Sequence, residues 1–189
     1  MAVVEIRPAG PEEAAALSAI YAASWKRAYA GIVPQTYLDR LREDHWVPYF
    51  TGEESSGRRS VAVLTVDGRA AGAASFGPAR EEAFSGWGEV ISIYLHPDFY
   101  GRGYGAPLLG YACRSLYDAG FRRAYLWVLE KNRSARRFYE KHGFVFQGDR
   151  LETEMDGQRL TELRYACMLA GKSDCPAGRE EKEAAKYDL

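Results

Sequence analysis

Residues 89–105 read EVISIYLHPDFYGRGYG, and this stretch decides the fold. Its first seven residues are mostly β-branched or aromatic, which predicts a buried strand over residues 89–95. The strand is expected to end at Pro97, because proline cannot donate to a β-ladder and restricts the residue before it. Beyond the glycines, apolar residues recur at helical spacing as far as Gly120: Leu108, Leu109, Ala112, Cys113 and Leu116. The predicted order is strand, glycine loop, helix.

The glycine loop is Tyr100-Gly101-Arg102-Gly103-Tyr104-Gly105, with three glycines in its last five residues. Glycine lets the backbone adopt conformations closed to other residues and turn successive N–H groups toward one point. The helix that follows presents unpaired donors and about half a positive charge at its N-terminus. Together these features favour binding of a phosphate or pyrophosphate, to which Arg102 could add a formal charge. A glycine-rich turn that only redirects the chain is the structural alternative.

Two kinds of phosphate site fit these glycines. The pattern Gly101-x-Gly103-x-x-Ala106 matches the dinucleotide fingerprint, and Glu130 ends the next strand where an acid would meet a ribose. A dinucleotide fold needs several further strand–helix units, whereas only one clear helix and a hairpin follow. A Walker loop is excluded, because no Gly-Lys-Ser/Thr follows the glycines.

The stretch also resembles the GNAT N-acetyltransferases, which use acetyl-coenzyme A. Their loop reads Gln/Arg-x-x-Gly-x-Gly/Ala and is matched by Tyr100-x-x-Gly103-x-Gly105, with a tyrosine where Gln or Arg is usual. Residues downstream match the family's second signature: Asn132-x-x-Ala135-x-x-Phe138-Tyr139-x-x-x-Gly143-Phe144. Two motifs at family spacing, joined by the expected helix and strand, are more specific than either alone.

The resemblance implies an α/β fold with a mixed, mainly antiparallel sheet of about seven strands flanked by about four helices. In this family the central strand splays from its neighbour and exposes backbone groups to the pantetheine arm and the thioester oxygen. Asn132 would contact the pantetheine, or cap its own helix, or do both. The implied coenzyme-binding residues are Ile93, Tyr94, Leu95, Tyr100, Gly101, Arg102, Gly103, Tyr104, Gly105, Ala106 and Asn132.

The rest of the chain predicts one domain over residues 1–170 and a polar tail over residues 171–189. Residues 52–60 are expected to form an exposed loop. Further strands are expected over residues 3–7, 61–66, 69–76, 124–129, 144–151 and 160–169. Helices are expected from Pro11 to about residue 30, over residues 35–42 and over residues 134–141.

Composition is typical of a soluble globular protein, with 47% hydrophobic and 27% charged residues in a chain of 189. The formal net charge of −1 shows no basic footprint, so nucleic acid is not an expected partner. No apolar run approaches a membrane span, and the first residues lack a signal-peptide pattern. Cys113, Cys167 and Cys175 lack metal-ligand spacing, so we expect a cytoplasmic protein with neither disulfides nor a metal.

The first helix carries an aromatic stripe that includes Trp25 and Tyr29. Such a stripe is often simply core. Residues 24–34 are similar to a segment common in small bacterial GNAT proteins, in which this region forms one wall of the acceptor pocket. The resemblance therefore makes Trp25 and Tyr29 candidate acceptor-binding residues.

Acetyl transfer to an amine needs an unprotonated nucleophile, yet a lysine-like amine of pKa about 10.4 is neutral in only about one molecule in a thousand at pH 7. A base therefore matters. Glu89 stands four residues before Ile93, the spacing at which histone-type members of the family carry their base. The alternative for Glu89 is a strand-end glutamate that faces solvent. A second branch of the family carries its base at the position of Trp127, so that arrangement is absent.

Tyr139 is the candidate proton donor to the departing thiolate. A phenol of pKa about 10 is protonated at pH 7, and the thiolate has a pKa of about 8.5. The alternative is that Tyr139 only packs beside Phe138.

The leading hypothesis is an acetyl-coenzyme A-dependent N-acetyltransferase that works by direct transfer to a primary amine. The acceptor could be a polyamine, an amino acid, an aminoglycoside-like molecule or a peptide. Members of the family commonly self-associate, so a homodimer is among the partners that the resemblance implies. A non-catalytic acyl-coenzyme A-binding module and a NAD-binding enzyme are the alternatives.

Overall fold

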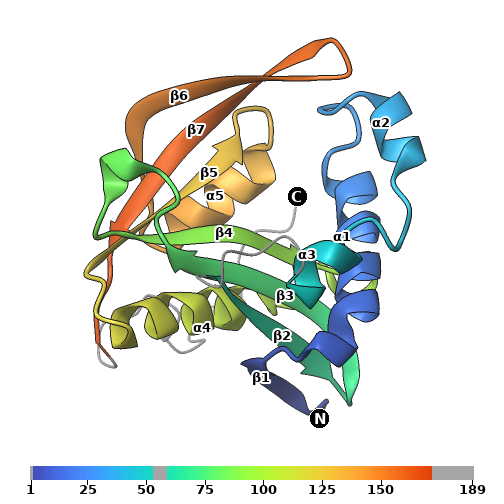
Figure 1. The fold of residues 1–189 in the computed structure, drawn as a ribbon, viewed down its shortest axis with the longest axis horizontal. Helices are drawn as coiled ribbons and strands as arrows, with labels where there is room; N and C mark the ends of the chain where they lie inside the picture. The colour runs from blue at the N-terminus through green and yellow to red at the C-terminus, as the bar shows by residue number, and fades with distance from the viewer. Residues whose placement is uncertain (1, 53–58, 172–189) are drawn as a thin grey trace, which may run out of the picture.

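The computed structural model describes residues 2–52 and 59–171. Their seven strands form one sheet in the order β1-β2-β3-β4-β5-β7-β6 (Figure 1). The strands are β1 (Val4–Pro8), β2 (Ser60–Val66), β3 (Arg69–Pro78), β4 (Gly88–Leu95), β5 (Arg123–Leu129), β6 (Val145–Met155) and β7 (Gln158–Met168). The helices are α1 (Ala14–Ala28), α2 (Gln35–Arg40), α3 (Val47–Thr51), α4 (Gly105–Asp118) and α5 (Arg133–Lys141), with single 3-10 turns at Pro11–Glu13, Glu82–Phe84 and Pro97–Phe99.

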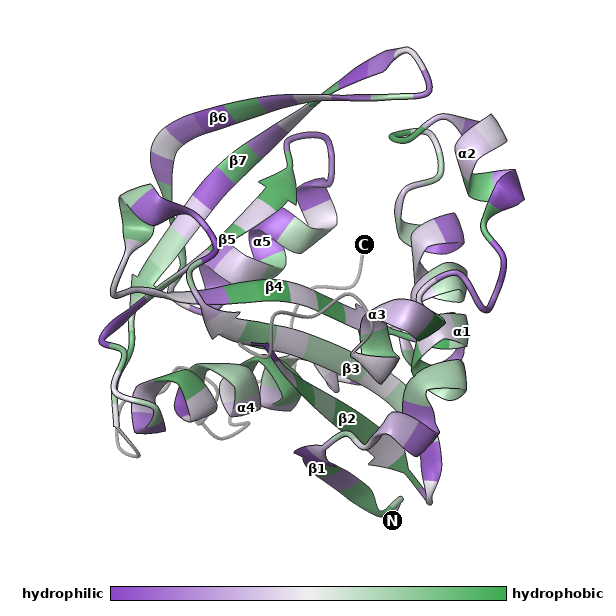
Figure 2. Cartoon of the chain, viewed as in Figure 1, coloured by the Kyte–Doolittle hydropathy of each residue, from purple (hydrophilic) through white to green (hydrophobic). Residues whose placement is uncertain are grey.

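Two helices cover opposite faces of the central strands. Successive side chains of a strand point to opposite faces, so Val63 and Ala73 pack with α1 whereas Leu64 and Ala74 pack with α4. Both sets are fully buried. Figure 2 shows hydrophobic residues along β2 and β4, which lie between these layers. The mainly antiparallel α/β fold expected from the resemblance is confirmed.

The strands β4 and β5 form the one parallel pair among the described residues, and they pair over two positions only, Gly88 with Ala124 and Glu89 with Tyr125. Beyond these positions β4 continues against β3 as far as Leu95, while β5 continues against β7. A bulge at Ile91, which has no partner on β3, bends β4 at the point where the two strands separate. The splayed central strand that the resemblance implies is therefore present.

Element boundaries agree with the sequence prediction to within a few residues, with three differences. The five-residue helix α3 was not predicted, since its segment has no apolar period of its own. The helix α2 ends at Arg40, two residues earlier than expected, and β6 runs to Met155 because it pairs with β7 up to the turn at Asp156 and Gly157. Residues 53–58 of the expected loop and residues 172–189 of the expected tail lie outside the described residues.

No helix within the described parts of the chain has the length and apolar character needed to cross a lipid bilayer.

The contact of β3 with β4 leaves no room for a side chain at Gly72. A Cβ there would lie 2.9 Å from the backbone oxygen of Tyr94 and 2.4 Å from a methyl carbon of Leu95. We expect Gly72→Ala to lower the free energy of unfolding by about 1–3 kcal/mol, because the β4 backbone must shift. The control is Gly171→Ala, whose Cβ would have as its nearest neighbours the hydroxyl oxygen and two ring carbons of Tyr117, at 3.5–3.6 Å. Guanidinium denaturation measures both, and equal effects would contradict this explanation.

Candidate active site

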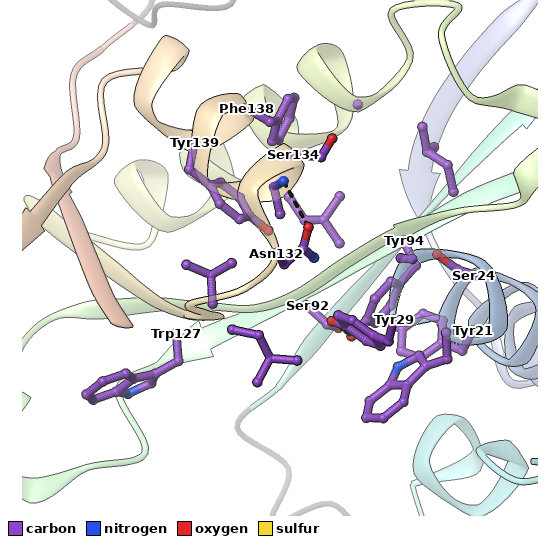
Figure 3. A pocket seen from close by; sticks show the side chains of 18 of the residues that line it. Tyr21, Ser24, Tyr29, Ser92, Tyr94, Trp127, Asn132, Ser134, Phe138 and Tyr139 are labelled. Atoms are coloured by element: carbon purple, nitrogen blue, oxygen red, sulfur yellow. Dashed lines mark hydrogen bonds between the residues drawn. The ribbon is translucent and has the colours of Figure 1, made fainter. Parts of the chain in front are cut away.

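A cavity of about 1160 Å³ follows the gap between β4 and β5. The glycine loop, α1, both strands, α5 and the β6–β7 hairpin all contribute to its lining. Figure 3 shows Tyr139 and Asn132 on one side of this pocket and Tyr29 and Tyr94 on the other. The pocket therefore brings together residues from both sequence motifs and from the first helix.

The glycine loop lies at one end of the pocket. Gly101 and Gly103 have φ angles of +73° and +81°, a left-handed conformation that favours glycine, and no atom lies within 4 Å of where their Cβ would be. The backbone N–H groups of residues 101–104 make no hydrogen bond to the described residues. These free donors, followed directly by the N-terminus of α4, make a site that fits a pyrophosphate.

The side chains of Tyr100 and Arg102, both in this loop, contact other residues of the protein. Tyr100 lines the pocket, but its hydroxyl shares a 2.8 Å hydrogen bond with the hydroxyl of Ser24 on α1. The guanidinium of Arg102 lies 5.6 Å from the ring centre of Phe99, and Arg102 is not part of the pocket lining. The loop therefore offers backbone donors to an anion, and no side-chain contribution from Arg102 is visible.

The predicted coenzyme strand forms the floor of the pocket. Ile93, Tyr94 and Leu95 all line it. The Tyr94 hydroxyl is 3.0 Å from the hydroxyl of Tyr29, and burial raises the pKa of Tyr94 well above its usual value. Beyond Glu89 the edge of β4 that faces β5 has no ladder partner, so its backbone groups are available to amides of a bound molecule.

Asn132 caps α5 and also lines the pocket. Its side-chain oxygen accepts a 3.1 Å hydrogen bond from the backbone N–H of Ala135, drawn as the dashed line in Figure 3. The N-cap alternative is therefore confirmed. The side-chain NH₂ makes no hydrogen bond to the described residues, so it remains free to donate to a ligand.

Tyr139 lies on α5, two helical turns beyond Asn132, and lines the same part of the pocket. Its ring packs against Phe138 and Phe144, with centroid distances of 5.3 and 5.9 Å. Burial raises the pKa of Tyr139 above the ordinary phenol value. The hydroxyl is thus protonated at neutral pH, as a proton donor requires.

Trp25 lies on α1 and Tyr29 directly follows its last residue, at the other side of the pocket. Their ring centroids are 4.8 Å apart, and Trp25 also lies 5.4 Å from Trp46 and 6.0 Å from Tyr37. Burial raises the pKa of Tyr29 to about 12. The rings that line the pocket form an aromatic wall, a term we use below for Trp25, Tyr29, Trp46 and Tyr94.

Glu89 does not line the pocket. Its side chain is buried, with 1% of the residue exposed, so the solvent-facing alternative is wrong. The carboxylate accepts hydrogen bonds from the backbone N–H, Nε and Nη2 of Arg80 at 2.6–3.1 Å. Its role as the base stays a prediction, which this ion pair does not favour because the carboxylate is already occupied.

Comparison with known proteins identifies the family of the chain. Residues 18–144 match the family described as the acetyltransferase (GNAT) family. The protein named uncharacterized N-acetyltransferase YuaI, from Bacillus subtilis, is 32% identical over 169 residues, covering 85% of this chain and 91% of its own length. The chain belongs to the GNAT acetyltransferase family.

Two further relatives extend the comparison. A spermidine N(1)-acetyltransferase of Thermoplasma acidophilum is 26% identical over 142 residues, covering 75% of this chain and 88% of its own. The crystal structure of YncA from Salmonella typhimurium with its cofactor acetyl-CoA superposes with a TM-score of 0.68 at 23% identity, covering 91% of this chain and 97% of that one. The similarity to the YncA structure shows a shared fold.

As a GNAT protein, the chain is an N-acetyltransferase that uses acetyl-coenzyme A. The non-catalytic binding module is therefore not supported. The NAD-binding alternative fails on the fold, because a dinucleotide fold needs a parallel sheet and only β4 and β5 pair in parallel among the described residues. Glu130, which would have met the ribose, instead pairs with Arg150 at 2.8 Å outside the pocket lining.

Arg80, Glu81 and Glu162 line this GNAT pocket but are not among the residues predicted for the site. Arg80 and Glu81 follow β3, and Glu81 accepts a 2.7 Å hydrogen bond from the indole N–H of Trp127. Glu162 lies within β7, between two other strands. Glu162 could have been noticed in the sequence, because it lies at an interior position of a predicted strand and such positions are usually apolar.

The Glu89–Arg80 pair generates a prediction about stability. We expect Glu89→Gln to lower the free energy of unfolding by about 1–3 kcal/mol, because it weakens charge-assisted hydrogen bonds to a buried acceptor. The control is Glu130→Gln, which breaks an exposed pair with Arg150 and should cost at most about 1 kcal/mol. Urea denaturation measures both variants. A stable Glu89→Gln enzyme that loses the acid limb of its pH–rate profile would instead establish Glu89 as the base.

Proposed function

We propose that this enzyme transfers an acetyl group directly from acetyl-coenzyme A to a primary amine of a small molecule or a peptide. The observation that carries this proposal is one continuous pocket with free backbone N–H donors at one end and the aromatic wall at the other. The gap between β4 and β5 joins the two ends. Both reactants can therefore meet in a single site, as direct transfer requires.

The coenzyme-binding part of the proposal rests on four groups of residues. The N–H groups of residues 101–104 and the N-terminus of α4 would hold the pyrophosphate. The unpaired edge of β4 at Ile93, Tyr94 and Leu95 and the amide of Asn132 would hydrogen-bond the pantetheine. Bound there, the coenzyme supplies an acetyl thioester that an amine can attack. Exposed N–H groups at the same edge would stabilise the developing oxyanion.

Tyr139 would protonate the departing thiolate. It lines the pocket, and its neutral form persists because burial raises the pKa of its hydroxyl. Trp25 and Tyr29 would contact the acceptor, since they line the pocket from α1 and from the residue that directly follows it.

The test of this function is an amine panel assayed by release of coenzyme A thiol. Polyamines belong in the panel because one relative is named a spermidine acetyltransferase. Amino acids, aminoglycosides and peptides with a free N-terminus complete it. Acetylation of at least one amine supports the proposal, and hydrolysis of acetyl-coenzyme A without any acetylated amine would refute it.

The glycine loop generates a prediction about coenzyme binding. Gly103→Ala should weaken binding of coenzyme A about tenfold, because alanine disfavours a φ of +81° by about 1–2 kcal/mol and the loop would move its N–H groups. Gly68→Ala is the matched control, since Gly68 has a φ of +78° in the β2–β3 turn and does not line the pocket. Isothermal titration calorimetry with coenzyme A measures both. Equal affinities of the two variants for coenzyme A would show that the loop does not take part in binding it.

Tyr139 generates a prediction about turnover. We expect Tyr139→Phe to lower kcat by about 100-fold, the lower end of the range for acid catalysis, because the thiolate is already a tolerable leaving group. Affinity for coenzyme A should be unchanged, since the ring and its packing against Phe138 and Phe144 remain. Single-turnover thiol release measures the rate. Unchanged turnover would show that Tyr139 only packs.

A further inference from the structure

Glu162 is a carboxylate placed in the middle of the sheet. It lies on β7, opposite Leu129 of β5 and Leu151 of β6, and all three residues line the pocket. The alternation of side chains along β5 puts Leu129 on the same face as Trp127, another pocket residue. Glu162 therefore faces the pocket close to the end of β5, just before Asn132.

The carboxylates near this pocket differ in what they contact. Glu89 is held by three N–H groups of Arg80, and Glu81 accepts a hydrogen bond from the indole of Trp127. Glu162, although half-buried, makes no hydrogen bond or ion pair with the described residues. A partly buried carboxylate without a hydrogen-bond partner loses some of its solvation, so a ligand group that supplies hydrogen bonds and positive charge is its natural complement.

Glu162 interacts electrostatically with Arg80 and with Tyr29. Burial raises the pKa of Glu162, and the positive charge of Arg80, on the segment after β3, partly opposes that shift. Tyr29, directly after the end of α1, has its pKa raised in part by Glu162. The strands on either side present leucines at its register position, and Arg164, two residues along β7, pairs with Asp149. The carboxylate thus stands opposite the aromatic wall.

We propose that Glu162 binds the ammonium group of the acceptor and takes its proton, which makes it the general base of the acetyl transfer. The inference rests on the function proposed above. A cation placed between this carboxylate and the rings of Trp25 and Tyr29 is attracted by the negative charge and by the aromatic rings. The pocket therefore selects an amine that arrives protonated. A carboxylate whose pKa is raised by burial is also a better base than an exposed one.

Residues of this pocket can supply and accept every proton that moves during the acetyl transfer. Glu162 takes one proton from the ammonium, and the neutral nitrogen forms a bond to the acetyl carbon while the carbon–sulfur bond breaks. Tyr139 gives its proton to the sulfur and regains one from the nitrogen through solvent. Glu162 then releases its proton to solvent, so the products are an amide, a thiol and one proton.

The test compares Glu162→Gln with Glu154→Gln, an exposed glutamate on β6 that does not line the pocket. With the amine found in the panel, we expect Glu162→Gln to lower kcat/KM by about 100-fold or more and to lose the acid limb of its pH profile. Glu162→Asp keeps a carboxylate and should keep that limb at a reduced rate. Glu154→Gln should behave as the wild type, and coenzyme A affinity should be equal in all four proteins.

Two readouts do not depend on turnover. Calorimetry of the amine with the enzyme–coenzyme A complex should show weaker binding for Glu162→Gln only. Carbon-13 NMR of labelled glutamate carboxyls in the free enzyme should show Glu162 titrating at higher pH than free glutamate. A Glu162→Gln enzyme with wild-type kcat/KM and an intact acid limb, or a Glu162 carboxyl that titrates like free glutamate, would overturn the proposal. A wild-type enzyme that acetylates no amine would overturn the proposed function first, and this one with it.

Discussion

The separation of β4 from β5 is the constraint on which the site depends. The two strands pair at Gly88 and Glu89 only, and the bulge at Ile91 bends β4 away. Backbone N–H and C=O groups in a protein interior need partners, so an unpaired strand edge beside a pocket is stable only when water or a ligand reaches it. The gap thus supplies hydrogen-bonding groups without any dedicated side chain. A fully paired sheet would close the pocket.

The other parts of the site occupy positions that this gap defines. The glycine loop follows the end of β4, and Asn132 follows the end of β5, so both coenzyme elements stand at the same mouth of the gap. Tyr139 comes two helical turns after Asn132 on α5 and lines the same pocket. Glu162 comes from β7, the next strand beyond β5. A single irregularity in strand pairing therefore places groups that are far apart in the sequence around one point.

Local sequence determined much of this arrangement, and those parts could be predicted. The strand before the loop, the glycines with positive φ and the cap at Asn132 each depend on residues within a few positions. Contacts between distant segments could not be read in the same way. Glu89 was recognised as a strand-end carboxylate, but its burial follows from Arg80, nine residues earlier. Glu162 was missed because an alternating pattern predicts a strand without indicating which strands flank it.

Tyr100 shows how a departure from the family pattern is accommodated. The family places Gln or Arg at the start of the loop, whereas here the tyrosine hydroxyl bonds to Ser24 on α1, 76 residues earlier. Ser24 directly precedes Trp25, so the same contact connects the coenzyme loop to the helix that carries the aromatic wall. Burial keeps the hydroxyls of Tyr29, Tyr94 and Tyr100 protonated, because it raises the pKa of each. The tyrosines of the wall and loop therefore add hydrogen bonds and packing without negative charge. Because these tyrosines carry no charge, they leave the electrostatic attraction between the proposed base on β7 and a cationic acceptor unopposed on the side of the aromatic wall, while Arg80 weakens it from the segment after β3.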